Sequence, residues 1–192
     1  MVKALKTAVS RRLGAGAWAV ILAAIALGAD APTQMIDAGG LTFQAPASWR
    51  SLPPASSMRR AELKVAPAEG DQEPAELVVF AFPGGAGSVE ANVKRWQNQF
   101  KGKDGQPPKI ESKVVKGKNV DVTRVETAGH YFPMTFPGQP KQADRPNYRL
   151  LGAIVQVGDT GYFLKMVGPD KTMQAARDDF DRLIASSSAE KP

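Results

Sequence analysis

Short apolar segments with the two-residue period of β-strands recur along the chain, and they constrain its fold more than any other feature. The segment 76–82, Glu-Leu-Val-Val-Phe-Ala-Phe, is nearly all apolar and is typical of a central strand. Segments 110–115 and 120–126 are predicted to pair as a half-exposed hairpin, because apolar and polar residues alternate in them. The remaining predicted strands cover residues 41–44, 58–65, 148–157 and 162–167.

Two segments instead have the 3.6-residue period of an amphipathic helix. The first spans residues 89–100, where four large apolar side chains share one face and Ser88 is placed to cap the helix. The second follows Pro169 and has an apolar stripe made of Met173, Ala176, Phe180, Leu183 and Ile184. The order strands, helix, strands, helix predicts an α+β fold, in which an antiparallel sheet of about seven strands is layered with two main helices.

The first 31 residues have the pattern of a secretory signal peptide. Basic residues lie near the start, residues 13–27 are uncharged and mostly apolar, and small residues follow. The apolar stretch is shorter than the roughly 20 residues that span a bilayer, so no stable membrane span is expected after cleavage. We therefore expect a periplasmic or secreted protein.

The cleavage site and the export route stay open. Ala29-Asp30-Ala31 fits the small-x-small rule but is followed by Pro32, and Ala26-Leu27-Gly28 is the alternative. The pair Arg11-Arg12 suits a twin-arginine signal, whereas Gly14 stands where that signal favours a large apolar residue. We favour the general secretory route.

Beyond the signal peptide, the sequence predicts three parts. Residues 32–38 are expected to be a flexible linker, residues 39–187 a single domain and residues 188–192 a disordered tail. The chain has no cysteine, so packing rather than disulfide bonds must hold the fold together. The lack of cysteine also excludes a lipid anchor on cysteine, thiol catalysis and cysteine metal sites.

The charge balance does not favour nucleic acid as a partner. The net charge of the full chain is +6, and without the first 31 residues it falls to +3. The lysine-rich stretch 101–118 also holds acidic residues, and no aromatic residue lies between Phe100 and His130. We interpret this stretch as a solvated surface.

The order of the predicted elements resembles a known fold. The residues that carry the resemblance are Leu41-Thr42-Phe43, Pro46-Ala47-Ser48-Trp49, the stretches 148–154 and 161–169, and the closing helix with Phe180 and Leu183. On these residues the chain resembles the Mog1/PsbP-like fold, and more closely the short exported bacterial proteins of unknown function in that group. The resemblance covers residues 39–186 and implies an α/β/α sandwich. Known members act as binding or accessory proteins rather than enzymes, and no residue roles carry over.

No catalytic or metal-binding motif stands out, and we expect neither an enzyme nor a cofactor. His130 is the single histidine, and neither a Gly-x-Ser-x-Gly elbow nor a His-x-x-Glu pair is present. The glycine-rich segment 83–88 lacks the residues of a phosphate-binding loop. Asp178, Asp179 and Asp181 are predicted to lie on a helix, where adjacent carboxylates diverge, so we interpret them as a solvated face.

The most unusual segment spans residues 129–138, within an irregular, proline-rich insertion predicted at residues 127–147. Its aromatic and Met side chains either form a contact surface for a ligand or partner, or fold back over the core as a lid. The residues of this possible surface are His130, Tyr131, Phe132, Met134, Phe136, Arg145 and Tyr148.

These features together predict an exported, non-enzymatic binding or accessory module whose protein or small-molecule partner is unknown. Two alternatives stay open: a hydrolase that uses carboxylates without a recognisable motif, and a structural component of a cell-envelope assembly. Turnover abolished by a single Asp or Glu substitution would favour the first alternative. Co-purification with envelope components would favour the second.

Overall fold

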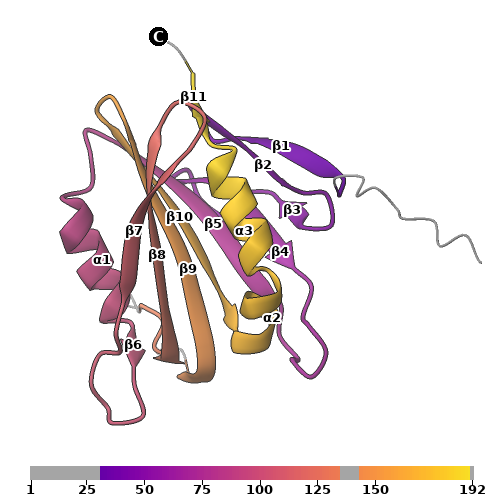
Figure 1. Ribbon diagram of the computed structural model, residues 1–192, viewed down its shortest axis with the longest axis vertical. Coiled ribbons are helices and arrows are strands. Elements are labelled where there is room, and N and C mark those ends of the chain that lie inside the picture. Colours follow the sequence, from indigo (N-terminus) through magenta and orange to yellow (C-terminus); the bar gives the residue numbers. More distant parts are fainter. Residues whose placement is uncertain (1–30, 135–142, 191–192) are drawn as a thin grey trace, which may run out of the picture. The chain divides into compact units, whose positions relative to one another are not determined.

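The computed structural model describes residues 31–134 and 143–190, and its central feature is an antiparallel sheet (Figure 1). Seven strands follow one another across the sheet, and β7 (Glu111–Lys116) pairs with the first half of β8. In spatial order, the seven are β3 (Arg50–Leu52), β4 (Arg59–Val65), β5 (Ala75–Pro83), β10 (Thr160–Pro169), β9 (Arg145–Val157), β8 (Asp121–Tyr131) and β6 (Phe100–Lys101). The α+β class with a largely antiparallel sheet is therefore confirmed.

The two faces of this sheet carry separate apolar cores, because successive side chains of a strand point to opposite sides. One face, here called the α3 face, presents Leu77, Leu151 and Leu164. It is covered by α2 (Asp170–Ala175), α3 (Arg177–Ala185) and a small sheet. The opposite face, called the α1 face, presents Leu150 and Phe163 and packs against α1 (Val89–Gln97). Figure 1 shows α1 and α3 on opposite sides of the sheet.

The small sheet corrects two of the predicted boundaries. It contains β1 (Thr33–Asp37), β2 (Leu41–Pro46) and β11 (Ser188–Ala189), in that order. The predicted linker 32–38 is therefore wrong, because most of it forms β1, in which Ile36 is buried opposite Phe43. The prediction of a disordered tail at residues 188–192 is also wrong for its first two residues, since Ser188 and Ala189 pair with β2.

The first helix is capped as expected but ends earlier than its apolar pattern suggests. The Ser88 hydroxyl accepts a hydrogen bond from the backbone amide of Ala91 at 3.2 Å. The helix ends at Gln97, and Phe100 reaches the same core from β6, where it pairs with Tyr131. Trp96 lies against Gly152 of β9, and a Cβ atom at Gly152 would come within 2.3 Å of the indole ring.

Two further predictions need correction. The irregular insertion 127–147 is shorter than expected, because β8 continues to Tyr131 and β9 begins at Arg145. A bulge between Gly129 and Tyr131 accommodates the change of register between these strands. The last helix is divided at Ala176 into α2 and α3, and all five residues of its predicted apolar stripe are buried.

Candidate functional site

A groove with a volume of about 580 Å³ lies over the part of the α1 face that α1 leaves uncovered. One side is formed by Asn92, Arg95 and Gln99 at and just after α1, and the opposite side by Met58 and Arg59 at the start of β4. The volume lies within the range of roughly 300–1,000 Å³ typical of small-molecule sites.

A row of aromatic rings forms the floor of this groove. Phe80 and Phe82 of β5 stack with ring centroids 6.2 Å apart. The edge of Phe163 on β10 meets Phe82 at 5.6 Å and Trp96 at 6.4 Å, so the row runs from the sheet to α1. Phe80 and Phe82 are only partly buried, which leaves aromatic surface open to a ligand.

Two methionines stand at the rim of the groove. Met58 is 58% exposed and Met134 is 47% exposed, and both contribute to the groove lining. The other strongly exposed large apolar side chains of the described residues, Met35 and Val114, lie on β1 and β7, outside the groove. Methionine side chains are flexible and polarizable, and they adapt to apolar ligands of varied shape.

Lys165 brings a basic group into this apolar site. It lies on β10 with Val78 of β5 and Gly152 of β9 as its strand neighbours. Its Nζ atom donates hydrogen bonds to Gln99 Oε1 at 2.5 Å and to the Tyr131 hydroxyl at 3.3 Å. Burial lowers the pKa of Lys165 from 10.5 to about 8, although the nearby negative charge of Glu76 acts in the opposite direction.

Four of the seven residues predicted from the sequence lie together at one end of the groove. Tyr131 and Met134 line the groove itself. Tyr131 also lines an adjoining cavity of about 270 Å³ with Arg145 and Tyr148. The Glu73 carboxylate accepts hydrogen bonds from the Tyr148 hydroxyl at 2.8 Å and from Arg145 at 3.0 Å. Burial raises the pKa of Tyr131 to about 12, so this hydroxyl stays protonated at neutral pH.

The remaining predicted residues are not brought to the groove. His130 is exposed on β8, with its Nδ1 atom 3.7 Å from a carboxylate oxygen of Asp144. Phe132 lies beneath the ammonium group of Lys101, 5.0 Å from its ring centroid. Phe136 falls outside the described residues.

The aromatic floor (Phe80, Phe82 and Phe163) and Lys165 beside it are not among the site residues predicted from the sequence. The strand segments that contain them nevertheless carry a signal. Phe80 and Phe82 alternate with buried Val79 and Ala81, so the aromatic pair had to share one face. Lys165 is the single charge within the apolar stretch 161–169. A charged residue in such a position indicates that one face of the strand contacts polar groups or a ligand.

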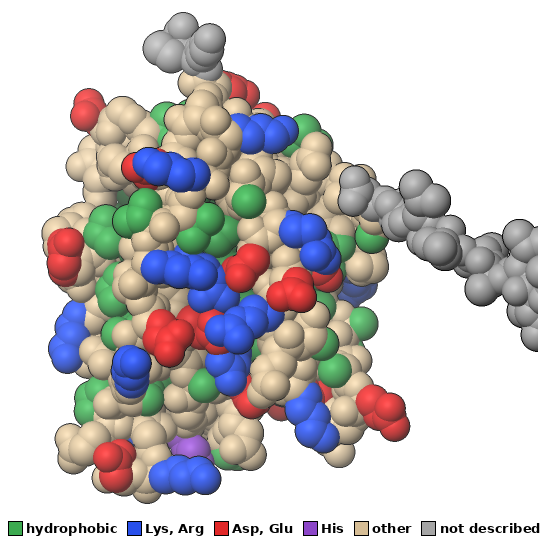
Figure 2. Space-filling model, in the orientation of Figure 1, with side chains coloured by type: hydrophobic (Ala, Val, Ile, Leu, Met, Phe, Trp, Pro, Cys, Tyr) green, Lys and Arg blue, Asp and Glu red, His purple; other side chains and the backbone are tan. Residues whose placement is uncertain are grey.

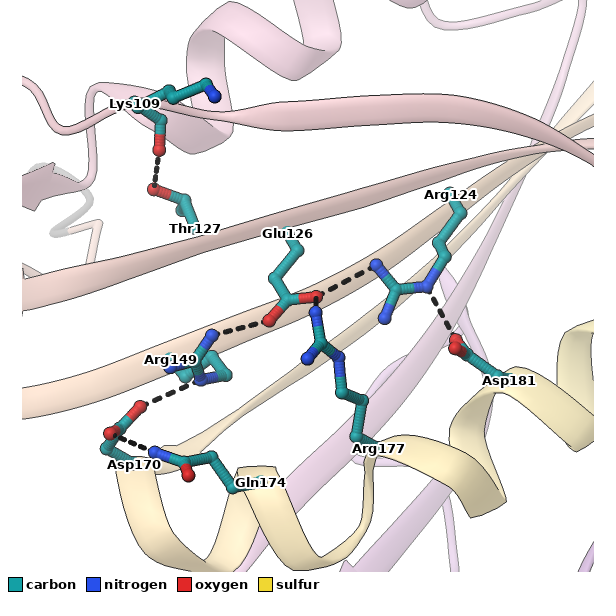
Figure 3. A network of polar contacts seen from close by, with 9 residues as sticks. All are labelled: Lys109, Arg124, Glu126, Thr127, Arg149, Asp170, Gln174, Arg177 and Asp181. Carbon is teal, nitrogen blue, oxygen red and sulfur yellow. Dashed lines mark hydrogen bonds and ion pairs between the residues drawn. The ribbon is translucent and has the colours of Figure 1, made fainter.

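A second polar region, on the α3 face, is a network of ion pairs centred on Glu126 (Figure 3). The Glu126 carboxylate accepts hydrogen bonds from Arg149 at 2.5 Å, Arg177 at 2.7 Å and Arg124 at 2.9 Å. Arg124 and Arg149 also pair with Asp181 and Asp170, at 2.5 Å and 2.8 Å. In Figure 2, acidic and basic side chains are interspersed across the middle of the side on which β7 and α3 lie.

The charges of this network compensate one another. Burial alone would raise the pKa of Glu126, but the three guanidinium groups outweigh burial and lower it below the usual value. Burial would also lower the pKa of Arg124, and its two carboxylate partners instead raise it. A polar cavity of about 460 Å³ adjoins the network and is lined by both acidic and basic side chains. We therefore assign the network a role in joining α2 and α3 to the sheet.

The other sequence candidates do not contribute to the groove in the described part of the chain. Of the predicted solvated face of the last helix, Asp178 is exposed, whereas Asp179 pairs with Arg182 and Asp181 belongs to the ion-pair network. The glycine-rich connection between β5 and α1 adopts positive φ angles at Gly84, Gly85 and Gly87. Within residues 31–134 and 143–190, no group of three or more His, Asp or Glu side chains is arranged to hold a metal ion. No helix in those ranges is long and apolar enough to cross a membrane.

Comparison with known proteins identifies the fold. No protein-family model matches the chain, and no curated protein matches it in sequence. The solution structure of cyanobacterial PsbP (CyanoP) from Synechocystis sp. PCC 6803 is similar, with a TM-score of 0.50 and 14% identity over 86% of this chain and 96% of CyanoP. The chain therefore has the Mog1/PsbP-like fold, as its sequence pattern predicted.

Two further solved structures are similar to the chain. A protein from Bacteroides thetaiotaomicron matches with a TM-score of 0.47 and 13% identity, over 84% of this chain and 49% of that protein. PA94 from Pseudomonas aeruginosa, a protein of unknown function, matches with a TM-score of 0.49 and 8% identity, over 83% of this chain and 98% of PA94.

Proposed function

We propose that this protein is an exported, non-enzymatic binding module, and that its groove between α1 and β4 holds a small amphipathic ligand. The observation that carries the proposal is the aromatic floor made by Phe80, Phe82 and Phe163, which α1 covers only in part. Apolar side chains make up half of the lining residues and polar or charged side chains the other half, which suits a ligand that has both an apolar and a polar part.

The exposed methionines at the rim favour a ligand-binding role for the groove over a purely structural one. Met58 precedes β4 and Met134 follows β8, and both side chains line the groove and keep about half of their surface exposed. An apolar ligand between them would remove this surface from water, at about 25 cal/mol for each Å² buried.

Export is the second part of the proposal and is supported by the sequence of residues 1–31. A positive start, an uncharged apolar stretch and small residues are the three parts of a secretory signal. Expression of the full chain in a bacterial host, followed by fractionation and intact-mass measurement, tests it. We expect a periplasmic or secreted product that has lost about 30 residues. A full-length mass in every fraction would contradict export with cleavage.

Binding is tested with the neutral apolar fluorophore N-phenyl-1-naphthylamine. We expect saturable binding to the purified protein, with energy transfer from tryptophan because Trp96 borders the groove. The double variant Met58→Ser, Met134→Ser should bind at least about fivefold more weakly, since it removes two apolar contacts. Its folding free energy should change by less than about 0.5 kcal/mol, as both side chains are exposed.

The matched control is Met35→Ser, Val114→Ser. It removes two apolar side chains that are at least as exposed and lie outside the groove, and its affinity should equal that of the unmodified protein. Equal weakening in both double variants would show that the fluorophore binds exposed apolar surface without using the groove, and would overturn the proposal.

A further inference from the structure

Lys165 is a mostly buried basic group that has hydrogen bonds but no carboxylate partner among the described residues. Its Nζ atom is satisfied only by the neutral oxygens of Gln99 and Tyr131, at 2.5 Å and 3.3 Å. The Tyr131 ring centroid lies 5.3 Å from the same atom, so the ammonium group also faces aromatic surface. Removing a charge from water is costly unless a charge of opposite sign accompanies it.

The ion-pair network on the α3 face shows how this chain treats its other buried basic groups. Arg124 is 5% exposed and pairs with both Glu126 and Asp181. Arg149 is 20% exposed and pairs with both Glu126 and Asp170. The nearest acidic neighbour of Lys165, Glu76 on β5, instead pairs with Lys64 at 4.0 Å. Within residues 31–134 and 143–190, Lys165 therefore lacks the carboxylate partner that Arg124 and Arg149 have.

The charge of the groove lining favours an anion at this position. Three basic side chains, Arg59, Arg95 and Lys165, line the groove, against the single carboxylate of Glu76. Arg59 is already engaged with Glu62 at 3.1 Å, and Arg95 donates to Asn92 at 2.7 Å. Arg95 and Lys165 are the groove cations without a carboxylate partner among the described residues, and Arg95 is exposed whereas Lys165 is mostly buried. An anionic head group would therefore supply the charged partner that Lys165 lacks.

We propose that the groove binds an organic carboxylate with an apolar body, with the carboxylate accepting hydrogen bonds from Lys165 and Tyr131 and the body lying over Phe80, Phe82 and Phe163. This inference rests on the proposed function and adds the chemical class of the ligand. A fatty acid and an aromatic acid share this chemistry. In either case the Tyr131 hydroxyl donates to the carboxylate while the Gln99 side chain continues to orient the ammonium group.

Calorimetric titration at pH 7 with two matched pairs of ligands tests the inference. The pairs are octanoate with 1-octanol, and 4-phenylbutyrate with 4-phenyl-1-butanol, so that each carboxylate is compared with an alcohol of similar body. We expect the carboxylate of at least one pair to bind about tenfold or more tightly than its alcohol, because a hydrogen bond between charged groups adds to the apolar contact. The pair that binds more tightly identifies the aliphatic or the aromatic source.

Two variants assign the preference to Lys165. Lys165→Met keeps the length and apolar character of the side chain, and the preference for the carboxylate should disappear while the alcohol still binds. Lys116→Met removes a lysine on β7 that is 79% exposed, and the preference should persist.

The remaining outcomes separate this inference from the proposed function. Equal affinity for acid and alcohol in the unmodified protein would overturn the carboxylate inference and leave the groove as a site for neutral ligands. A preference that survives in Lys165→Met would overturn the assignment to this residue. No binding of either pair, together with no binding of N-phenyl-1-naphthylamine, would overturn both.

Discussion

The two faces of the central sheet bury charge in opposite ways. On the α3 face, Glu126 accepts hydrogen bonds from three guanidinium groups, two of which also pair with aspartates. On the α1 face, the hydrogen-bond partners of Lys165 among the described residues are the neutral groups of Gln99 and Tyr131. The α3 face is covered by two helices and a small sheet, whereas α1 leaves a groove beside itself. On a face that other elements cover, buried charged groups must pair with one another. On a face that stays partly open, a charged group can instead pair with a ligand.

The largest effect is expected from Glu126→Ala, which removes the acceptor shared by Arg124, Arg149 and Arg177. Arg124 and Arg149, which are 5% and 20% exposed, would each keep one aspartate, and Arg177 would lose its Glu126 partner. We expect the free energy of unfolding to fall by about 3–5 kcal/mol, as measured by urea denaturation at pH 7.

The control for this variant is Asp121→Ala, which removes the exposed partner of Lys116. Its effect should stay below about 1 kcal/mol, because exposed ion pairs contribute little. A loss below about 1 kcal/mol for Glu126→Ala as well would show that the network does not hold α2 and α3 to the sheet.

On the α1 face, Trp96→Ala should cost about 3–5 kcal/mol, since the indole ring is buried against Gly152. Gly152→Ala should cost about 1–3 kcal/mol in the unmodified protein, because its Cβ would overlap the ring. In the Trp96→Ala background the same glycine change should cost almost nothing. Additive losses in this thermodynamic cycle would contradict direct packing of Trp96 on the strand.

A smaller effect of opposite sign is expected from Lys165→Met. The pKa of Lys165 is about 8 in the folded protein against 10.5 for an exposed lysine, so below pH 8 its charge destabilises the fold by roughly 3 kcal/mol or less. Between pH 8 and 10.5 the unfolded chain binds more protons at this site, so stability should rise with pH across that window.

Denaturation of both proteins from pH 7 to 10.5 measures this effect. The variant should be more stable than the unmodified protein at pH 7, and the difference should shrink as the pH approaches 10.5. Lys116→Met serves as the exposed control and should show no such convergence. A constant difference across the range would mean that burial does not perturb Lys165.

Strands with strong local patterns could be predicted from the sequence, and those that depend on distant partners could not. The apolar stretch 76–82 and the stripe of the last helix have signals of their own, and both match the structure. β1 and β11 are short and are stabilised by pairing with β2. The partners β2 and β11 lie near opposite ends of the sequence. Nothing in the local sequence reveals such a pairing.

The candidate site was predicted in part for the same reason. Tyr131, Met134, Arg145 and Tyr148 drew attention because they are aromatic, apolar or basic residues in or beside a proline-rich segment. The partners that complete the groove come from β5, β10 and α1, and only the folded sheet places Lys165 beside Gln99. The sequence shows that a lysine lies in an apolar strand. Whether that lysine has a carboxylate partner depends on three-dimensional packing, which the sequence does not show.

Methionine methyl groups offer the most direct test of the central claim, that the α1 face is the open, ligand-binding face. Met58 and Met134 border the groove, Met166 and Met173 are fully buried on the α3 face, and Met35 is exposed on β1. In a titration of protein labelled with [13C]methyl-methionine, octanoate is predicted to shift the resonances of Met58 and Met134 and to leave those of Met166, Met173 and Met35 in place. Shifts confined to Met166 and Met173, or spread equally over all five, would contradict the account.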